Sequence, residues 1–315
     1  MPPQTAATFL EALVRMLRAV PRKQRIVFPE GNDPRVQQAA LRLERDNLAV
    51  PIPLTTGDAR YAQLYFDLRR HKGITEAQAA EIAVQPLYTA ALMVASGDAD
   101  GFVGGAANTT AETVRAALHC IGPAPGIHTV SSAFLVAVQN FAFGHNGLLA
   151  FADCSVVIDP SPTELAEIAI ATAETTRTLI HAEPIVALLS FSTKGSASHP
   201  SIDKITEALT ILRKRAPDLI VDGELQADAA LIEAIGKSKA PGSPVAGRVN
   251  TLIFPDIASG NIAVKLVERL GGAAAIGPFL QGLAKPANDL SRGCSADDIY
   301  ASAVITALRS AHAAL

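Results

Sequence analysis

Charged residues are scarce in this 315-residue chain. Lysine, arginine, aspartate and glutamate together make up 18% of it, and the formal net charge is −3. A nucleic-acid-binding surface needs a basic excess, so the composition disfavours that class of protein, and an anionic ligand must be held by local positive groups. Hydrophobic residues make up 49%, enough for the large cores of two domains of ordinary size.

Cysteine is also scarce, and the spacing of the cysteines bears on disulfides and metal sites. The three cysteines are widely spaced and form no Cys-x-x-Cys motif: Cys120, Cys154 and Cys294. This pattern disfavours a disulfide framework or a zinc site, and the seven scattered histidines offer no pair at metal-ligand spacing. No apolar run reaches the ~18 residues of a membrane span, and Arg15 and Arg18 break the pattern of a signal peptide. We therefore expect a soluble cytoplasmic protein without a metal.

Short apolar segments alternate with helical patterns along the chain. Strands are expected at 25–29, 101–103, within 148–158, and at 185–191, 219–221 and 252–254, and 51–54 is a second short apolar segment. Helices are expected at 5–19, 34–47, 75–96, 109–121, 163–179, 202–214 and 296–313. This alternation favours an α/β fold with mostly parallel sheets and flanking helices. We expect a first domain of residues 1–125 plus 286–315 and a second of residues 126–285.

Residues 288–298 carry the densest set of reactive groups, in the order Asn-Asp-Leu-Ser-Arg-Gly-Cys-Ser-Ala-Asp-Asp. The hydroxyl of Ser291, the guanidinium of Arg292 and the carboxylate of Asp298 lie within a few residues of one another, just before or at the start of a helix. Such a set suits a reaction in which an anion is bound, an oxyanion develops and a proton is removed.

Simpler interpretations of the same residues stay open. Asp298 stands three positions after Ser295, so the two could form a capping box, and a capping carboxylate could still accept a proton. Arg292 could be a structural ion-pair partner, and Ser291 a turn hydroxyl. Cys294 has no histidine close in sequence to activate it, which disfavours a nucleophilic role.

A polar loop directly follows the apolar run at 185–191, and its residues are Ser192, Thr193, Lys194, Gly195 and Ser196. Ligands of open α/β sheets bind outside the carboxyl ends of the strands, and hydroxyls with a lysine and a glycine suit a phosphate group. A solvent-exposed polar loop without a ligand is the alternative.

Two other segments could bind ions. Thr109 and Thr110 open the helix that carries Arg115, which describes either an anion-binding helix end or a simple cap. Residues 222–228 hold three carboxylates that could suggest a magnesium site, although packing and hydrogen bonding are the favoured explanation.

Taken together, many segments closely resemble the phosphate acetyltransferases, also called phosphotransacetylases. The matching stretches are 28–31, 69–75, 99–110, 151–154, 189–196, 222–229, 245–250, 253–256, 260–261, 277–278 and 285–298. The resemblance implies a fold like that of the isocitrate and isopropylmalate dehydrogenases, with an active-site cleft between two domains, and a homodimer. It also implies transfer of an acetyl group between coenzyme A and phosphate, with coenzyme A as a substrate and no permanently bound cofactor.

The resemblance further assigns roles by motif position. Asp298 is then the base that deprotonates the coenzyme A thiol, Ser291 the donor to the developing oxyanion, and Arg292 the holder of the phosphoryl group of acetyl phosphate. Arg69 and Arg115 match arginines that bind substrate, the former through coenzyme A phosphates. The thiolate would attack acetyl phosphate directly in a ternary complex.

The sequence departs from the family pattern in two places. Asn32 stands where an acidic residue is usual. The region 54–68 is short, so we expect the sheet of the first domain to lack an edge element without loss of the active site. Three alternatives to an acetyltransferase are an acyltransferase for butyryl groups, a non-catalytic acetyl-CoA-sensing domain, and a dehydrogenase of the same fold. The last would need a nicotinamide site and metal-binding aspartates, for which no convincing set is present.

Overall fold

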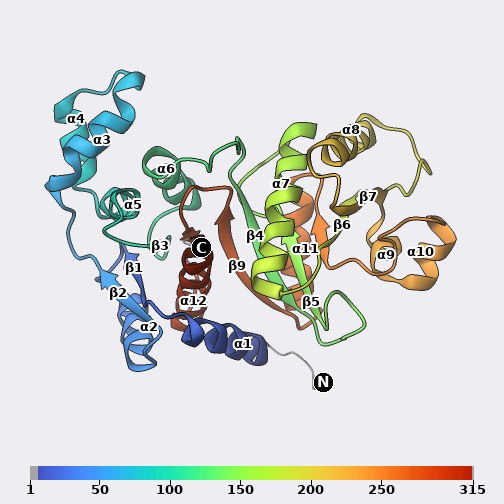
Figure 1. The fold of residues 1–315 in the computed structure, drawn as a ribbon, viewed down its shortest axis with the longest axis horizontal. Helices are drawn as coiled ribbons and strands as arrows, with labels where there is room; N and C mark the ends of the chain where they lie inside the picture. The colour runs from blue at the N-terminus through green and yellow to red at the C-terminus, as the bar shows by residue number, and fades with distance from the viewer. Residues whose placement is uncertain (1–5, 314–315) are drawn as a thin grey trace. The chain divides into compact units, whose positions relative to one another are not determined.

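The computed structural model describes residues 6–313, which fall into two compact units (Figure 1). The terminal unit comprises residues 10–127 and 277–313, and the central unit comprises residues 128–276 with residues 6–9. The chain thus passes between the units at 9/10, at 127/128 and at 276/277. The domain limits expected from the sequence lie near 125 and 285.

The sheet of the terminal unit has the strand order β2-β1-β3-β10-β9. The strands are β1 (Gln24–Phe28), β2 (Ala49–Pro53), β3 (Gly101–Gly104), β10 (Ala287–Asp289) and β9 (Ala274–Gln281), which begins in the central unit. The first four run parallel, and β9 pairs antiparallel with β10. The carboxyl ends of β1, β3 and β10 therefore meet at one edge of the sheet.

Three helices begin at this edge, each just after one of those strands. They are α2 (Pro34–Arg45) after β1, α6 (Thr110–Cys120) after β3 and α12 (Ala296–Ala313) after β10. A side chain caps each start: Asp33 accepts from the Arg35 amide, while Thr109 with Glu112 and Ser295 with Asp298 form capping boxes. Local sequence thus fixes where each helix begins.

The segment between β2 and β3 is helical. It contains η1 (Ala59–Tyr61), α3 (Ala62–Arg69), η2 (Arg70–Lys72), α4 (Glu76–Ala83) and α5 (Pro86–Ser96), and α1 (Ala6–Ala19) precedes β1. The prediction of one helical stretch over 75–96 is wrong, because α4 and α5 are separate helices bent by 99°. Pro86 occupies the first turn of α5, where its missing N–H is tolerated, whereas inside a longer helix it would break the hydrogen-bond ladder.

No single helix among residues 6–313 combines the length and the apolar character of a membrane span. Only the pair α4 and α5, taken across its bend, reaches that length and composition.

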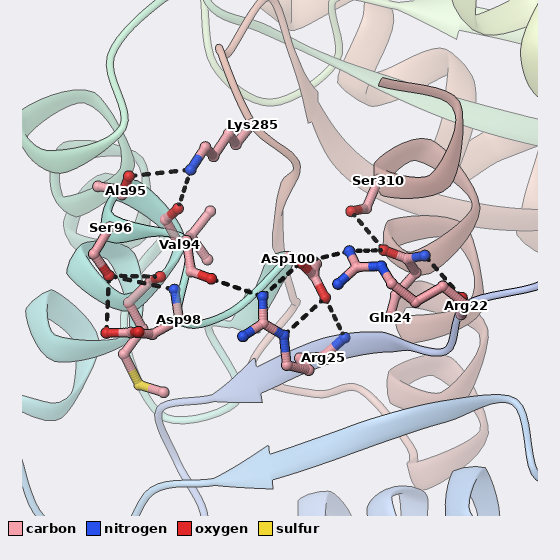
Figure 2. A network of polar contacts seen from close by, with 12 residues as sticks. Arg22, Gln24, Arg25, Val94, Ala95, Ser96, Asp98, Asp100, Lys285 and Ser310 are labelled. Carbon is pink, nitrogen blue, oxygen red and sulfur yellow. Dashed lines mark hydrogen bonds and ion pairs between the residues drawn. The ribbon is translucent and has the colours of Figure 1, made fainter. Parts of the chain in front are cut away.

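A polar cluster fastens β1 to β3 at the end of the sheet opposite the three helix starts (Figure 2). Asp100 accepts hydrogen bonds from the backbone amide of Arg25 at 2.7 Å, from its guanidinium at 2.9 and 3.1 Å, and from Arg22 at 2.8 Å. Lys285 donates to the carbonyls of Val94 and Ala95, which closes the last turn of α5. The cluster aligns the strands whose other ends carry the candidate site.

Within the central unit the strand order is β4-β5-β8-β6-β7. Its strands are β4 (Ser131–Ala137), β5 (Leu148–Ala152), β6 (Ile185–Leu189), β7 (Ile220–Leu225) and β8 (Thr251–Ile253). Its helices are α7 (Pro162–Thr175) continued by η3 (Thr176–Ile180), α8 (Pro200–Arg215), α9 (Ala227–Leu231), α10 (Glu233–Lys239) and α11 (Ile257–Arg269). All neighbouring strands are parallel except β4, which is antiparallel to β5.

The predicted α/β class with mostly parallel strands and flanking helices is confirmed. Strands β5 and β6 are buried almost throughout, as their continuous apolar sequences predict for strands covered on both faces. The segment 54–68 holds η1 and most of α3, and between β2 and β3 the described chain has no strand. The absence of a family edge element there stays a prediction.

Candidate active site

The carboxyl edge of the terminal sheet gathers chemically active side chains. From β1 the chain turns through α2 towards β2, whereas β3 lies on the opposite side of β1, so the strand order reverses at this point. Open α/β sheets bind ligands in the crevice at such a reversal. A pocket of about 350 Å³ lies here, and its polar lining includes Glu30, Gln85, Asn108, Glu112 and Arg115.

The loop between β10 and α12 makes a tight turn at this edge. The amide of Cys294 donates to the carbonyl of Ser291 at 2.9 Å, which leaves Arg292 and Gly293 at the tip. The side chains of Ser291 and Arg292 are exposed, and within residues 6–313 the Arg292 guanidinium has no hydrogen-bond or ion-pair partner. The pKa of Glu112, on α6, is lowered mainly by hydrogen bonds from Thr109. The positive charge of Arg292 contributes a smaller part of this effect, which indicates that Arg292 lies near α6. An uncommitted guanidinium can take a ligand's phosphate.

Asp298 lies one turn further on, at the start of α12. Its Oδ2 accepts from both the amide and the hydroxyl of Ser295 at 2.8 Å, and its own amide donates to that hydroxyl at 3.2 Å. The capping box is therefore present, and Asp298 is nevertheless exposed. No described residue donates to its second oxygen, Oδ1, which leaves that oxygen free to accept a proton.

Cys294 is buried beside this turn, and burial raises the pKa of its thiol. A buried thiol is protonated at neutral pH and is a poor nucleophile, which supports the choice of Asp298 rather than Cys294 as the reactive group.

The start of α6 brings further predicted residues to the same edge. Thr109 is committed to its capping box, and the hydroxyl of Thr110 donates to Asp289 Oδ2 at 2.6 Å. Arg115 is exposed on the next turn and lines the pocket. Arg69, at the end of α3, lies 3.4 Å from His119 Nε2, one further turn along α6. Arg115 thus belongs to α6, and Arg69 contacts the same helix through His119. Arg115 lines the pocket, whereas Arg69 does not.

Residues 192–196 form a loop of the central unit that is held by two carboxylates of β7. Glu224 Oε1 accepts from the Ser192 hydroxyl at 2.9 Å and from the Gly195 amide at 2.7 Å. Lys194 Nζ lies 2.5 Å from Asp222 Oδ1. The polar groups of this loop are therefore largely committed to Asp222 and Glu224, which explains the carboxylates near residue 222 as hydrogen-bond acceptors.

The rest of this loop follows the same pattern. The amide of Thr193 donates to Ser196 Oγ at 3.0 Å, and the third carboxylate, Asp228, pairs with Lys239 at 2.8 Å. Across the described residues, no group of three or more His, Cys, Asp or Glu side chains is arranged to hold a metal ion.

Comparison with known proteins identifies the family. The family model described as phosphate acetyl/butaryl transferase matches residues 53–307. The chain belongs to this family. It is 49% identical over 300 residues to a phosphate acetyltransferase of Paracoccus denitrificans, covering 90% of this chain and 94% of that protein. It is 44% identical over 317 residues to one of Thermoanaerobacterium thermosaccharolyticum, covering 93% and 97%.

A solved structure agrees with this assignment. The phosphotransacetylase from Streptococcus pyogenes has a TM-score of 0.90 and 41% identity, with 98% of this chain and 99% of that chain covered. The resemblance to the phosphate acetyltransferases that the sequence motifs indicate is confirmed.

The sequence alone does not single out three polar residues at the candidate site. Glu30 follows β1, and its Oε1 accepts from the Gly105 amide at 2.8 Å and from Asn108 Nδ2 at 2.7 Å. Asp289 ends β10, and burial raises its pKa to about 6. Arg35 lies in the first turn of α2. Glu30 follows β1 and Asp289 ends β10, and this position at the carboxyl edge is the signal that could have found these two.

Proposed function

We propose that the chain catalyses the reversible transfer of an acetyl group between acetyl-CoA and phosphate, as the names of its relatives indicate. The observation that carries the proposal is the arrangement of Ser291, Arg292 and Asp298 on one exposed turn and helix start. A hydroxyl donor, an unpartnered guanidinium and a carboxylate with a free oxygen are the three groups that the reaction needs.

Asp298 removes the proton of the coenzyme A thiol in this mechanism. A thiol with a pKa near 8.5 is mostly protonated at neutral pH, so a base increases the thiolate fraction at the moment of attack. Oδ2 of Asp298 stays bonded to Ser295 and fixes the carboxylate, while Oδ1 faces the thiol and takes the proton. The capping role and the base role are compatible.

The thiolate then attacks the carbonyl carbon of acetyl phosphate within a ternary complex. A carbon–sulfur bond forms, the bond from that carbon to the phosphate oxygen breaks, and inorganic phosphate leaves. Arg292 binds the phosphoryl oxygens with its planar pair of donors, and Ser291 donates to the carbonyl oxygen as its negative charge grows. No acyl-enzyme forms.

The remaining predicted residues are proposed to bind the substrates. Arg115, in the pocket, and Arg69 supply positive charge for the phosphates of coenzyme A. Thr109 and Thr110 present the amino-terminal end of α6, where helix amides favour an anion. The loop at 192–196 is proposed as a further contact.

The test is formation of acetyl-CoA from acetyl phosphate and coenzyme A, measured by the thioester absorbance, beside butyryl phosphate as the alternative substrate. Faster turnover of acetyl phosphate supports the proposal. Preference for butyryl phosphate would indicate the butyryltransferase alternative. Binding of acetyl-CoA without any turnover would contradict an enzyme and indicate a sensing domain. Covalently acetylated protein after incubation with acetyl phosphate alone would contradict direct attack.

We also propose a homodimer, formed through the exposed face of α11. Ile262, Leu266 and Leu270 recur at intervals of four and are 57%, 51% and 82% exposed, so they form an apolar stripe along one side of the helix. Sedimentation of wild type beside Leu266→Lys tests this, because a charge in the stripe should produce monomers. A wild-type monomer would contradict the proposal. The cytoplasm stays the predicted location, on the grounds of the cysteine pattern.

A further inference from the structure

Arg35 connects three separate segments at the carboxyl edge of the terminal sheet. A guanidinium has five N–H donors, and each has an acceptor here. Nε donates to Asp33 Oδ1 at 3.0 Å, and Nη2 donates to Asp33 Oδ2 at 2.7 Å and to the carbonyl of Ala106 at 2.9 Å. Nη1 donates to the carbonyls of Arg292 and Cys294, both at 2.9 Å. The donor set is complete.

Through these contacts Arg35 restrains the turn of residues 291–294, which carries Ser291 and Arg292. The two carbonyls bound by Nη1 flank Gly293, at the tip of the turn. Asp33 in turn fixes the guanidinium, and this hydrogen bond raises the pKa of Arg35, so its charge is permanent. The other contacts of the turn, Cys294 to Ser291 and Gly293 to Ser291 Oγ, are internal to it. Arg35 is thus the side chain that attaches the turn to α2 and to the loop after β3.

We propose that Arg35 is a positioning residue for acetyl transfer, holding the Ser291–Cys294 turn so that Ser291 and Arg292 face the substrate. The inference rests on the proposed roles of those two residues. Arg35 acts through backbone carbonyls, so it does not itself touch acetyl phosphate. A misplacement of about 1 Å in a catalytic group can cost on the order of 10²-fold in rate, which sets the scale of the expected effect.

Lysine cannot reproduce this arrangement although it keeps the positive charge. Its ammonium group has three donors at one point, whereas the acceptors of Arg35 are spread around a planar fork. Arg35→Lys therefore removes the geometry and leaves the charge, so it separates positioning from electrostatic attraction of the substrate.

Arg42 supplies the matched control, because it lies two turns further along α2 and also connects that helix to α12. It pairs with Asp297 at 2.6 Å and stacks over the Tyr300 ring at 3.9 Å, and it has no contact with the turn. We expect Arg35→Lys to lower kcat by about 10-fold or more, and Arg42→Lys to leave kcat within about twofold of wild type. Circular dichroism and thermal melting of both variants show that each is folded.

A triple variant separates positioning from a merely structural role. If Arg35 acts through Ser291 and Arg292, then adding Arg35→Lys to the Ser291→Ala and Arg292→Ala pair costs little more than that pair alone. Losses that multiply, or an Arg35→Lys kcat equal to that of Arg42→Lys, would overturn the inference. The single variants test the proposed mechanism separately, and full turnover in both Arg292→Ala and Ser291→Ala would contradict it. If Arg35→Lys still lost activity in that case, the loss would not act through these two residues, and the inference would be overturned as well.

Discussion

Oδ2 of Asp298 accepts hydrogen bonds from both the amide and the hydroxyl of Ser295, each at 2.8 Å. One carboxylate oxygen therefore caps α12, while the other has no donor among the described residues. This division allows the two roles of Asp298 to be tested apart. Asparagine can still accept from Ser295 through its carbonyl oxygen, but it cannot take a proton. We expect Asp298→Asn to lower kcat by roughly 10²-fold, the usual scale of acid–base catalysis, with little change in melting temperature.

Ser295→Ala is the matched control, because it removes the hydroxyl of the cap and keeps the carboxylate. The loss of a cap costs about 1 kcal/mol in the free energy of unfolding, so this variant should melt earlier and still turn over. The outcomes are read from steady-state rates and thermal denaturation side by side. Wild-type rates for Asp298→Asn would leave Asp298 with the capping role alone.

The sequence predicts this helix start well because capping is local. Ser295 with Asp298 and Ser161 with Glu164 are visible as residue spacings, and both capping boxes form. The alternation of apolar segments likewise predicts the parallel strands of both units. The sequence predicts no strand over β4, β9 or β10. Strand β10 has only three residues, two of them polar, and its burial arises from neighbours distant in sequence.

The site shows the same limit. Ser291, Arg292 and Asp298 can be recognised because their own side chains carry the chemistry. Arg35 binds the backbone carbonyls of Arg292 and Cys294, and a carbonyl is present at every residue, so no residue type at these positions indicates the contact. Contacts of this kind become visible only when the fold brings together residues that are 257 and 259 positions apart in the sequence.

Asp289 should make stability fall as pH rises through the acidic range. Burial raises its pKa from 3.8 to about 6, so between these values the native state holds a proton that the unfolded chain has lost. The stabilising effect of that proton is complete below pH 3.8 and lost by about pH 6. Asparagine cannot ionise, so Asp289→Asn should gain up to about 3 kcal/mol relative to wild type across this range.

Urea unfolding of both proteins at several pH values between 4 and 7 measures this difference. Asp298→Asn is a suitable comparison, since it alters an exposed carboxylate of the same segment. If the difference in the free energy of unfolding between wild type and Asp289→Asn did not change with pH, a protonated Asp289 in the folded protein would be contradicted.

Asp100 should make the stability of the protein fall as pH decreases, which is the opposite of the effect expected for Asp289. Although burial by itself would raise its pKa, hydrogen bonds from Arg25 and Arg22 lower it to about 2. The stabilisation is therefore present above pH 3.8 and lost as pH falls towards 2. Asp100→Asn should cost about 2 kcal/mol at neutral pH and much less near pH 2.

Asp297→Asn is the control for Asp100, because its ion pair with Arg42 is exposed, and such pairs contribute about 0–1 kcal/mol. Chemical denaturation at pH 7 and at pH 2.5 gives both comparisons. An equal cost for Asp100→Asn at the two pH values would show that its charge does not stabilise the contact between β1 and β3.

Lys194 pairs with Asp222, whose side chain is only 2% exposed. Burial by itself would raise the pKa of Asp222, but hydrogen bonds from Lys194 and Ser243 hold it below its ordinary value. Breaking a buried pair typically costs 3–5 kcal/mol, and here Ser243 and Arg213 would still contact the carboxylate. Because Lys194 is itself 35% exposed and these two contacts remain, we expect Lys194→Met to lower the free energy of unfolding by less than that range, about 2 kcal/mol.

Lys194→Met with Asp222→Asn should recover much of this loss, because the buried carboxylate charge that Lys194 helps to compensate is then absent as well. The double variant also tests the proposed substrate contact of the loop at 192–196 in a protein of restored stability. A raised KM for coenzyme A in the double variant would support that contact. A wild-type KM together with restored stability would show that Lys194 serves the packing of the loop on β7 and does not reach the substrate.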